Sequence, residues 1–428
     1  MSKLSIPVLD YSVFKYAYGK ASGGVTGSSK VEADVDGTSK SFQLKNSILD
    51  ASRTRRRMDG GKDHENFGEF IASQVGQQLL GESVPKVFLV PSKKKNRIMV
   101  ASRYLDGVQG TLDEYAEKEG VSQRQKSSGF KKKIKKEHVV VTFDKSDADN
   151  HKYGLKEEHR MDVARGMAYN ALCGNHDVNP GNLIVTKQGI CPIDFGKAFN
   201  KLLTGPVSIG GQIRNKDNRI LDFFNRETVT HLKRGRRQSK FWRDYENLVP
   251  SQELATALRE MSEAYGAQSG VEQAKAGFLE VMKQGNPGMK QHIADSLREI
   301  NRNIGGDEPG SSYTPEKVVD KVFNNIKNFY DSGQKQMADV AELMQLQVDI
   351  DNYIQEKSGL KSKEDIKTAY NGLQARPGIK TDNGIEWIKT SKTKPAFKGN
   401  LDQYIEHRTK ELASLAVSPK ISLLKRLA

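Results

Sequence analysis

The stretch Gly174-Asn175-His176-Asp177-Val178-Asn179-Pro180-Gly181-Asn182 leads into a short apolar run, Leu183-Ile184-Val185, and a second aspartate follows in Ile193-Asp194-Phe195-Gly196. The apolar run and the turn residues Lys187-Gln188-Gly189 predict a β-hairpin, because short strands joined by a glycine-containing turn fold back on each other. Asp177, Asn182 and Asp194 therefore stand in a fixed order around one hairpin. This ordered set decides how the rest of the chain is interpreted.

These residue types fit the transfer of a phosphoryl group. In such sites one aspartate orients the attacking hydroxyl, while an asparagine and a second aspartate hold divalent metal on a triphosphate. Hard cations prefer oxygen ligands, which Asn182 and Asp194 would supply. Asp, Asn, Pro and Gly also favour ordinary turns, but a simple turn leaves Asp194 unexplained. We therefore expect a site for ATP with Mg²⁺ or Mn²⁺, in which Asp177 is the catalytic residue.

The block resembles the catalytic core of the protein-kinase-like superfamily. It is similar to the His-Gly-Asp-x-x-Pro-Gly-Asn stretch of aminoglycoside phosphotransferases and to loops of phosphoinositide kinases and HipA-like kinases. Asn175-His176-Asp177 departs from the His-Arg-Asp of ordinary eukaryotic protein kinases, and no Ala-Pro-Glu triplet closes an activation segment. The overall pattern resembles atypical effector kinases that intracellular bacteria inject into host cells. The resemblance is close over residues 174–196, extends in outline over residues 10–240, and does not reach further.

The amino-terminal segment predicts a glycine-rich hairpin. Phe14 to Tyr18 and Val31 to Val35 have the composition or alternation of strands, and the glycine-rich stretch 19–29 lies between them. Asp36-Gly37 is a strong signal for a two-residue hairpin turn. A third strand should therefore return directly after this turn.

Lys45 lies on the polar face of that returning strand, opposite the apolar Phe42 and Leu44. Backbone N–H groups of a glycine-rich hairpin can contact phosphates, and a lysine can pair with them. The candidate ATP-binding residues of this region are Lys45, Gly23 and Gly24. The loop lacks a clean Gly-x-Gly-x-x-Gly, so a surface loop and an exposed strand lysine are the alternatives.

An amphipathic helix is predicted for His64 to Leu80, with Asp63 as its cap. Glu69 lies beside the apolar stripe and could reach Lys45, as the helix glutamate of a kinase does. Glu65 is the competing choice, and two solvated glutamates are the structural alternative. The stripe itself comprises Phe67, Phe70, Ile71, Val75 and Leu79.

Two apolar runs after this helix complete the predicted small lobe. Val87 to Val90 and Ile98 to Ala101 are apolar enough to be its last strands. Ser102 to Gly107 then resembles the hinge whose backbone would bond adenine in a kinase. Arg103 and Tyr104 are therefore the candidate adenine-binding positions.

The basic residues of the chain are clustered. Sixty-eight basic and 53 acidic residues give a net charge of +15. Such runs are usually solvated segments, and the alternative is a polyanion site in which several cations converge on phosphates. Nucleic acid is not expected, because no base-reading motif is recognisable. An inositol polyphosphate activator suits a kinase better, and the candidate ligands are Arg53, Arg55, Arg56, Lys131, Lys132, Lys133, Lys135 and Lys136.

Composition and helical spacing divide the chain into four segments. We expect a small lobe at 1–105, a large lobe with the catalytic loop at 106–300, a linker at 301–314 and a helical module at 315–428. Apolar residues recur at helical spacing beyond residue 245. The expected fold class is therefore α+β: a bilobal protein-kinase-like core with an all-helical carboxy-terminal extension.

Aromatic residues and lysines mix near the carboxy end of that module, including Trp387, Lys389 and Phe397. An ordinary loop is the first interpretation of this composition, and a phosphoinositide-containing membrane surface is the alternative. No apolar run approaches the ~20 residues of a membrane span, and the amino terminus lacks an apolar signal region. With Cys173 and Cys191 interpreted as free thiols, we expect a cytosolic protein, in the host cytoplasm if it is an effector, that associates peripherally with membranes.

The sequence thus predicts an atypical kinase that transfers the γ-phosphoryl group of ATP. Asp177 would accept or orient the hydroxyl proton, Asn182 and Asp194 would bind metal, Lys45 would bind phosphate, and Glu69 would position Lys45. A serine or threonine of a host protein is the first-choice acceptor, and a phosphoinositide or small molecule is the alternative. A pseudokinase scaffold and a nucleotidyl transferase are the competing functions, but a decayed site usually loses one of these residues.

Overall fold

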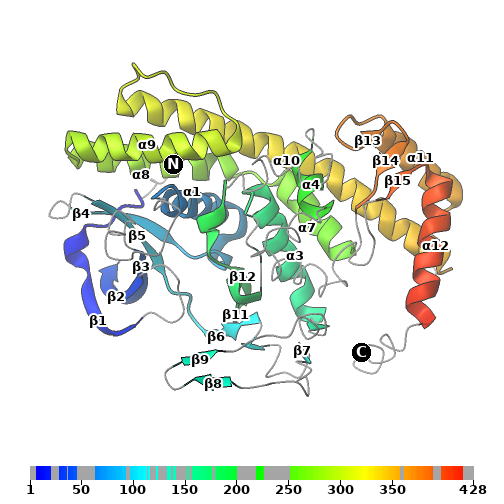
Figure 1. Ribbon diagram of the computed structural model, residues 1–428, viewed down its shortest axis with the longest axis horizontal. Helices are drawn as coiled ribbons and strands as arrows, with labels where there is room; N and C mark the ends of the chain where they lie inside the picture. Colours follow the sequence, from blue (N-terminus) through cyan, green and yellow to red (C-terminus); the bar gives the residue numbers. More distant parts are fainter. Residues whose placement is uncertain are drawn as a thin grey trace. The chain divides into compact units, whose positions relative to one another are not determined.

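The computed structural model describes a mixed α and β protein (Figure 1). The chain divides into two compact units: residues 1–207 with 263–332, and residues 208–262 with 333–428. This division does not coincide with the boundaries expected at 105, 300 and 314, and each unit is described by itself. The described residues are 6–20, 28–35, 37–45, 63–92, 97–112, 114–115, 122–123, 133–135, 138–140, 152–153, 157–175, 178, 180–199, 218–225, 251–356, 361–388 and 397–417.

A five-stranded sheet forms the amino-terminal part of the first unit, in the order β1-β2-β3-β5-β4. All of its neighbouring strands are antiparallel. A short 3-10 helix, η1 (Tyr11–Val13), precedes the sheet. The strands are β1 (Lys15–Lys20), β2 (Ser28–Val35), β3 (Thr38–Lys45), β4 (Val87–Ser92) and β5 (Arg97–Arg103).

The predicted hairpin between β2 and β3 is confirmed. Val35 pairs with Thr38, which leaves a two-residue turn. Gly37 has a φ of +74°, a left-handed conformation that glycine adopts without steric cost. One face of the sheet is apolar, and its fully buried residues are Val31, Ala33, Phe42, Leu44, Val90, Met99 and Ala101. The other face carries Lys45, as the alternation of β3 requires.

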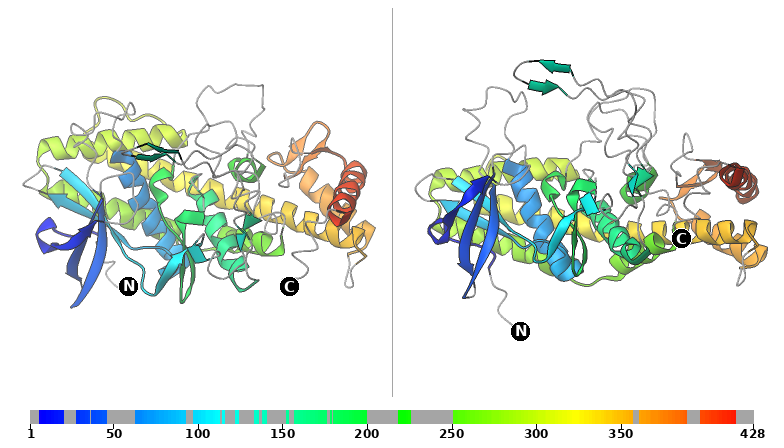
Figure 2. Two further views of the ribbon diagram at one scale, coloured as in Figure 1. Left: turned by 60° about the horizontal axis from the view of Figure 1, so that its bottom comes forward. Right: turned by 90° about the horizontal axis from the view of Figure 1, so that it is seen from below.

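The predicted helix after β3 is also confirmed as α1 (Asp63–Leu80). Residues 66–76 are buried without interruption. This burial exceeds that of an ordinary amphipathic helix, because α1 contacts β4 and β5 as well as helices α8 (Ala267–Gln284) and α9 (Pro287–Ile304) (Figures 1 and 2). A short 3-10 turn, η3 (Gly81–Ser83), follows α1 and leads into β4.

Three glycines allow other elements to approach α1 closely. A Cβ on Gly270 of α8 would lie 2.5 Å from the Cα of Val75, so the helix crossing requires glycine there. A Cβ on Gly76 would lie 3.1 Å from the ring of Tyr169, and one on Gly68 would lie 3.2 Å from the carbonyl oxygen of Ala198. Helix α1 is therefore held on several sides by backbone or rigid aromatic atoms.

A second sheet in this unit has the order β12-β11-β6. The strands β11 (Leu183–Thr186) and β12 (Gly189–Pro192) form the predicted hairpin, with Thr186 paired to Gly189. Strand β6 (Val108–Thr111) pairs with β11. Helix α3 (Glu157–Leu172) packs on β12, and two 3-10 turns flank the hairpin, η6 (Pro180–Asn182) and η7 (Phe195–Lys197).

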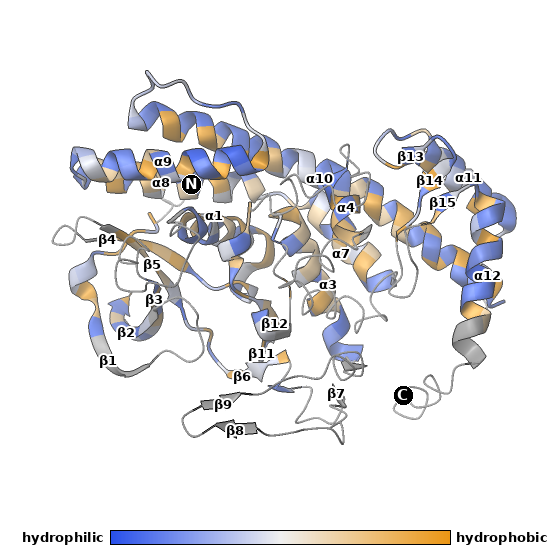
Figure 3. Cartoon of the chain, in the orientation of Figure 1, coloured by the Kyte–Doolittle hydropathy of each residue, from blue (hydrophilic) through white to orange (hydrophobic). Residues whose placement is uncertain are grey.

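The expected linker at 301–314 begins inside a helix and is tied to the first unit. Helix α9 continues to Ile304, and α10 (Pro315–Ile354) begins at Pro315. The buried side-chain amide of Asn301 donates to the carbonyl oxygens of Gly306 (3.2 Å) and Asp307 (2.9 Å) and accepts from Asn325 at 2.7 Å. Polar and apolar residues alternate along α8, α9 and α10, as in helices with one buried face (Figure 3).

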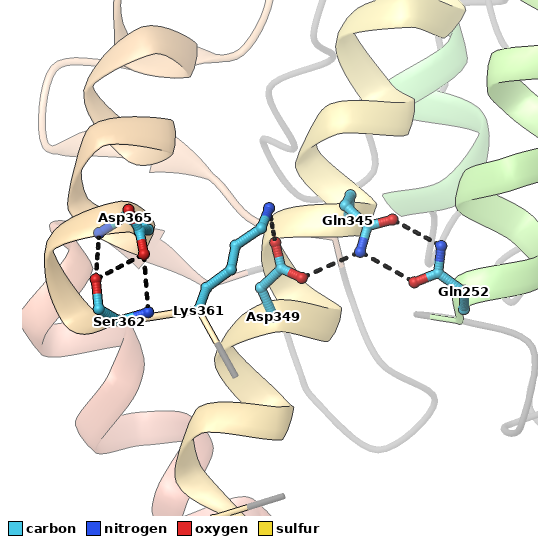
Figure 4. A network of polar contacts seen from close by, with 6 residues as sticks. All are labelled: Gln252, Gln345, Asp349, Lys361, Ser362 and Asp365. Carbon is cyan, nitrogen blue, oxygen red and sulfur yellow. Dashed lines mark hydrogen bonds and ion pairs between the residues drawn. The ribbon is translucent and has the colours of Figure 1, made fainter. Parts of the chain in front are cut away.

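The second unit contains α4 (Arg219–Asn225), α7 (Gln252–Glu263), the later part of α10, α11 (Lys363–Gln374) and α12 (Leu401–Val417). A chain of polar contacts joins α7 to α10: the side chains of Gln252 and Gln345 exchange two hydrogen bonds, and Gln345 also donates to Asp349 (Figure 4). Lys361 contacts Asp349 at 2.7 Å. Helix α11 then starts with a capping box formed by Ser362 and Asp365.

The expectation that residues 315–428 are all helical is wrong. A three-stranded antiparallel sheet lies between α11 and α12, formed by β13 (Lys380–Thr381), β14 (Gly384–Glu386) and β15 (Lys398–Gly399). Pro377 and Gly378 follow α11 directly, and neither residue continues a helix well. Trp387 extends β14 by donating its backbone N–H to the carbonyl of Phe397 at 3.0 Å.

The interpretation of Trp387 as a membrane-facing aromatic is also wrong. Its side chain is fully buried and stacks on Tyr404 of α12, with ring centroids 3.7 Å apart. Tyr370 of α11 stacks on the other side at 6.2 Å. Tyr370 and Tyr404 lie 17 residues away from Trp387 on either side in the sequence, so no local pattern indicated this stack. Lys389, Lys392 and Lys394 lie outside the described residues.

Four further short strands are described between residues 122 and 153. They are β7 (Ser122–Gln123), which pairs with β10 (Lys152–Tyr153), and β8 (Lys133–Lys135), which pairs with β9 (His138–Val140). Cys173 and Cys191 are buried free thiols, as expected. Within the described ranges, no helix combines the length and the apolar character needed to cross a membrane.

Candidate active site

Three charged residues that the sequence selected meet in the first unit. The ammonium of Lys45 lies 2.5 Å from a carboxylate oxygen of Glu69 and 3.6 Å from one of Asp194. The side chains of Lys45 and Glu69 are 13% and 5% exposed, whereas that of Asp194 is 50% exposed. The cluster therefore has a buried ion pair on one side and an acid open to solvent on the other.

Each of these residues is placed by a different element. Lys45 is the last residue of β3 and pairs in register with Val100 of β5, which fixes its backbone. Glu69 lies in the continuously buried part of α1, between the apolar Phe67 and Phe70. Of the two glutamates that the sequence left in competition, Glu69 is the one that contacts Lys45.

Burial and charge act in opposite directions on this pair. Burial opposes the charged form of Lys45, but the nearby carboxylates of Glu69 and Asp194 outweigh it and raise the lysine pKa above its ordinary value. Burial also raises the pKa of Glu69, and the ammonium of Lys45 offsets part of that effect. Lys45 is thus a cation throughout the neutral pH range.

The hairpin of β11 and β12 brings Asn182 and Asp194 to the same end. Leu183 pairs with Pro192, and the next residues continue the ladder, because the N–H of Ile193 donates to the carbonyl of Asn182 at 2.9 Å. Asp194 has a φ of +58°, a conformation that costs a non-glycine residue about 1–3 kcal/mol. Such strain persists only where the surroundings hold it.

The residues present fit a hard divalent cation that keeps much of its water. Asp194 and Asn182 offer a carboxylate and an amide oxygen, and the Asp194 side chain is accessible. Among the described residues there is no cluster of three or more His, Cys, Asp or Glu side chains arranged for a metal. Mg²⁺ is commonly bound by one or two carboxylates together with substrate phosphates, and it does not need an all-protein cage.

Two contacts tie Asp194 and the turn after it to the loop that precedes Asp177. The buried side-chain amide of Asn175 donates to the Asn170 side chain at 2.7 Å and to the carbonyl of Asp194 at 3.4 Å. The N–H of Phe199 donates to the carbonyl of Cys173 at 2.9 Å. The loop 173–175 therefore holds both ends of the 194–199 segment. The sequence pattern did not predict this role for Asn175, which appeared only as a departure from the His-Arg-Asp motif.

A second ion pair connects this segment to α1. The ammonium of Lys197 contacts the carboxylate of Glu65, one helical turn before Glu69. From the sequence, Glu65 was predicted only as the alternative to Glu69, and Lys197 was not among the candidate residues. The usable signal was the spacing: two acids four residues apart on one helix, and a lysine directly after Asp194-Phe195-Gly196.

The predicted adenine-binding positions are engaged in the sheet. The N–H of Arg103 donates to the carbonyl of Lys86 at 2.8 Å, and the N–H of Tyr104 donates to the carbonyl of Ser41 at 3.0 Å. The Arg103 guanidinium pairs with Asp106 at 2.9 Å. These two backbone N–H groups are therefore occupied. That the backbone of this segment bonds adenine stays a prediction.

Several other candidate residues lie outside the described residues. They are Asp177, Gly23, Gly24, Arg53, Arg55, Arg56, Lys131, Lys132 and Lys136. Lys133 and Lys135 are in β8, but their side chains are not described. Asn175 and Val178, the described residues nearest to Asp177 in the sequence, are both buried.

Comparisons with known proteins give little beyond the geometry. No protein-family model and no curated protein matches the chain. Among solved structures, the chain is similar to the crystal structure of a Helicobacter pylori proinflammatory kinase, CtkA, with 14% sequence identity and a TM-score of 0.34. The match covers 77% of this chain and 98% of that one. A likeness this distant supports no argument about activity.

Proposed function

We propose that the chain is an atypical kinase with a bilobal protein-kinase-like core, which transfers the γ-phosphoryl group of ATP to a hydroxyl. One observation carries the proposal: Lys45 is buried against Glu69 and also faces the exposed Asp194 at 3.6 Å. A structural ion pair would not need a second, solvent-open acid on a strained backbone. A phosphate-binding lysine beside a metal-binding aspartate needs both features.

The proposed roles follow from charge and position. Lys45 would hold oxygen atoms of the triphosphate, and Glu69 keeps its ammonium aimed from β3 toward the site. Asp194 and Asn182 would hold the divalent metal, which supplies positive charge to the transferred group. Asp177 would orient the attacking hydroxyl or accept its proton. The loop 173–175 binds both ends of the 194–199 segment, which holds the proposed metal ligand Asp194 in place.

The proposed acceptor is a serine or threonine of a host protein, and a phosphoinositide or small-molecule hydroxyl is the alternative. The intact set of Lys45, Asp177, Asn182 and Asp194 favours catalysis over a pseudokinase scaffold.

The proposal is tested by incubating the full chain with Mg²⁺ and ATP labelled at the γ or the α phosphorus. Candidate protein substrates, phosphoinositide vesicles and water are offered as acceptors, and the products are separated by class. We expect label from the γ position alone to reach a hydroxyl acceptor. Label from the α position would identify a nucleotidyl transferase instead. No label in any product would refute the proposed function.

A further inference from the structure

The ion pair between Glu65 and Lys197 joins α1 to the turn that follows Asp194. Glu65 lies one helical turn before Glu69, so the two acids project from the same side of α1. Glu69 holds Lys45 of the sheet, and Glu65 holds Lys197 of the turn. Helix α1 therefore forms two ion pairs, each with a different part of the candidate site.

The turn that contains Lys197 has two strained residues. Asp194 and Phe199 both have a φ of +58°, and they bracket the short helix η7. Two hydrogen bonds fix the ends of the turn: the side-chain amide of Asn175 donates to the carbonyl of Asp194, and the N–H of Phe199 donates to the carbonyl of Cys173. Strained conformations relax unless neighbouring groups restrain them. Lys197 adds a side-chain restraint between these two ends.

The pair is partly buried: the side chains of Lys197 and Glu65 are 34% and 20% exposed. Ion pairs that water reaches on one side contribute less to folding than fully buried ones, because water solvates the separated charges. They can still select one local geometry among several of similar energy. Geometry matters here because a small displacement of a positioning group can reduce transfer steeply.

We propose that Glu65 and Lys197 form a positioning pair for the candidate phosphotransfer site. The pair holds the turn against α1, so that Asp194 keeps its distance from Lys45 while Lys45 stays paired with Glu69. Neither residue touches the reacting atoms. This inference rests on the proposed function, because the pair would keep the proposed metal ligand Asp194 at the correct distance from the proposed phosphate ligand Lys45.

The packing of α1 fixes the position of Glu65, the residue to which Lys197 is paired. Residues 66–76 are buried on all sides, and the α1–α8 crossing at Gly270 allows no lateral shift without separating backbones. The carbonyl of Ala198 also lies against Gly68 of α1. A helix held in this way is a fixed reference, and the turn is aligned to it by Lys197.

A matched control exists in the same unit. Lys290 of α9 and Glu316 of α10 form an ion pair at 3.0 Å, with side chains 33% and 45% exposed. This pair also joins two elements across a surface, but neither partner belongs to the candidate site. Removing it should reproduce any effect that the loss of an ordinary surface ion pair has on the fold.

The test combines backbone hydrogen exchange with steady-state kinetics on the full chain. The variants are Lys197→Met, Glu65→Gln, the conservative Lys197→Arg and the control Lys290→Met. Exchange is followed for the amides of 194–199, which include that of Ala198, bonded to Phe195 at 2.8 Å, and that of Phe199. Kinetics are followed as γ-label transfer at varied ATP.

We expect Lys197→Met and Glu65→Gln to speed exchange in 194–199 by about tenfold, because the turn opens locally. Their kcat should fall about tenfold, while KM for ATP stays within about threefold, since positioning is lost and Lys45 remains. Lys197→Arg should restore both values, and Lys290→Met should change neither.

Unchanged exchange in Lys197→Met, or unchanged kcat in an active protein, would overturn the positioning pair and leave the proposed function standing. A wild type that transfers no label would refute the proposed function itself, and this result comes from a separate measurement. An equal effect of Lys290→Met would also overturn the inference, because a generic loss of surface charge would then suffice.

Discussion

Two buried cations in this chain each face two carboxylates, and the two clusters differ in how they meet solvent. In the first unit, Lys45 contacts Glu69 and Asp194, and Asp194 is 50% exposed. In the second unit, Arg408 of α12 contacts Asp351 and Glu411, which are 19% and 17% exposed. Arg408 binds Asp351 with two parallel hydrogen bonds of 2.7 Å and Glu411 with one of 2.9 Å.

This difference in solvent exposure distinguishes a structural ion cluster from the candidate phosphotransfer site. Arg408 uses its planar fork on both acids, all three residues lie in helices, and no acid is left open. Lys45 offers a single ammonium, and its second acid is half exposed on a left-handed backbone. In a cluster that serves stability, each charged group is paired within the cluster and shielded from solvent. The Lys45 cluster keeps one acid accessible, at the cost of local strain.

The largest expected effect on folding comes from breaking the closed cluster. Arg408→Met should lower the free energy of unfolding by up to about 3–5 kcal/mol, because two largely buried carboxylates would lose their cation. Transfer by the molecules that remain folded should not change, since Arg408 lies outside the candidate site. Chemical denaturation and γ-label transfer on the same samples check both statements. Loss of transfer at full folding would contradict the division of roles.

A smaller effect is expected where helices cross. Gly270→Ala should destabilise the chain by about 1–3 kcal/mol, because its Cβ would lie 2.5 Å from the Cα of Val75 and must push α8 away from α1. Gly372 of α11 is the matched control in the second unit, because no atom lies within 4 Å of its Cβ position.

Gly372→Ala should stabilise the chain by up to about 1 kcal/mol through helix propensity. Thermal melting of both variants measures the contrast. Equal melting shifts would mean that the close packing of α1 does not contribute to stability.

The smallest effect concerns the reactivity of Lys45. Its pKa lies above the ordinary value of 10.5, so its ammonium loses the proton only at higher pH than that of a free lysine. Amine acylation requires the neutral form, and each unit of pKa lowers the neutral fraction about tenfold. Trace labelling near pH 9 should therefore modify Lys45 at least about tenfold more slowly than the exposed Lys380.

Glu69→Gln should raise the rate at Lys45, because one carboxylate that favours the ammonium is removed. Peptide mass spectrometry reads both sites in one digest. A Lys45 as reactive as Lys380 would contradict the buried, charge-paired lysine.

Local patterns predicted the parts of the fold that are local. The Asp36-Gly37 turn, the alternation in β3 and the stripe of α1 each depend on neighbours in sequence, and the structure contains all three. The same patterns brought Lys45, Glu69 and Asp194 forward, because each stands at a defined place in its element.

The features of the fold that the sequence did not predict depend on contacts between residues distant in the chain. Gly270 looks like a weak point in a helix, and only packing against Val75 explains it. Trp387 looked like a surface aromatic because its neighbours are lysines, yet Tyr370 and Tyr404 enclose it. The backbone N–H groups of Arg103 and Tyr104 donate to the carbonyls of Lys86 and Ser41, and no periodicity in the sequence indicates this pairing.

The central claim is tested most directly by comparing one acid from each cluster in the same assay. Asp194→Asn and Asp351→Asn remove the same charge, and the measurement is γ-phosphoryl transfer from ATP per folded molecule, with melting followed in parallel. We expect Asp194→Asn to lower transfer by about 10²–10³-fold with little change in melting. Asp351→Asn should lower the free energy of unfolding by about 1–3 kcal/mol and leave transfer intact. Transfer at the wild-type rate by Asp194→Asn would contradict the claim that the Lys45 cluster is a phosphotransfer site.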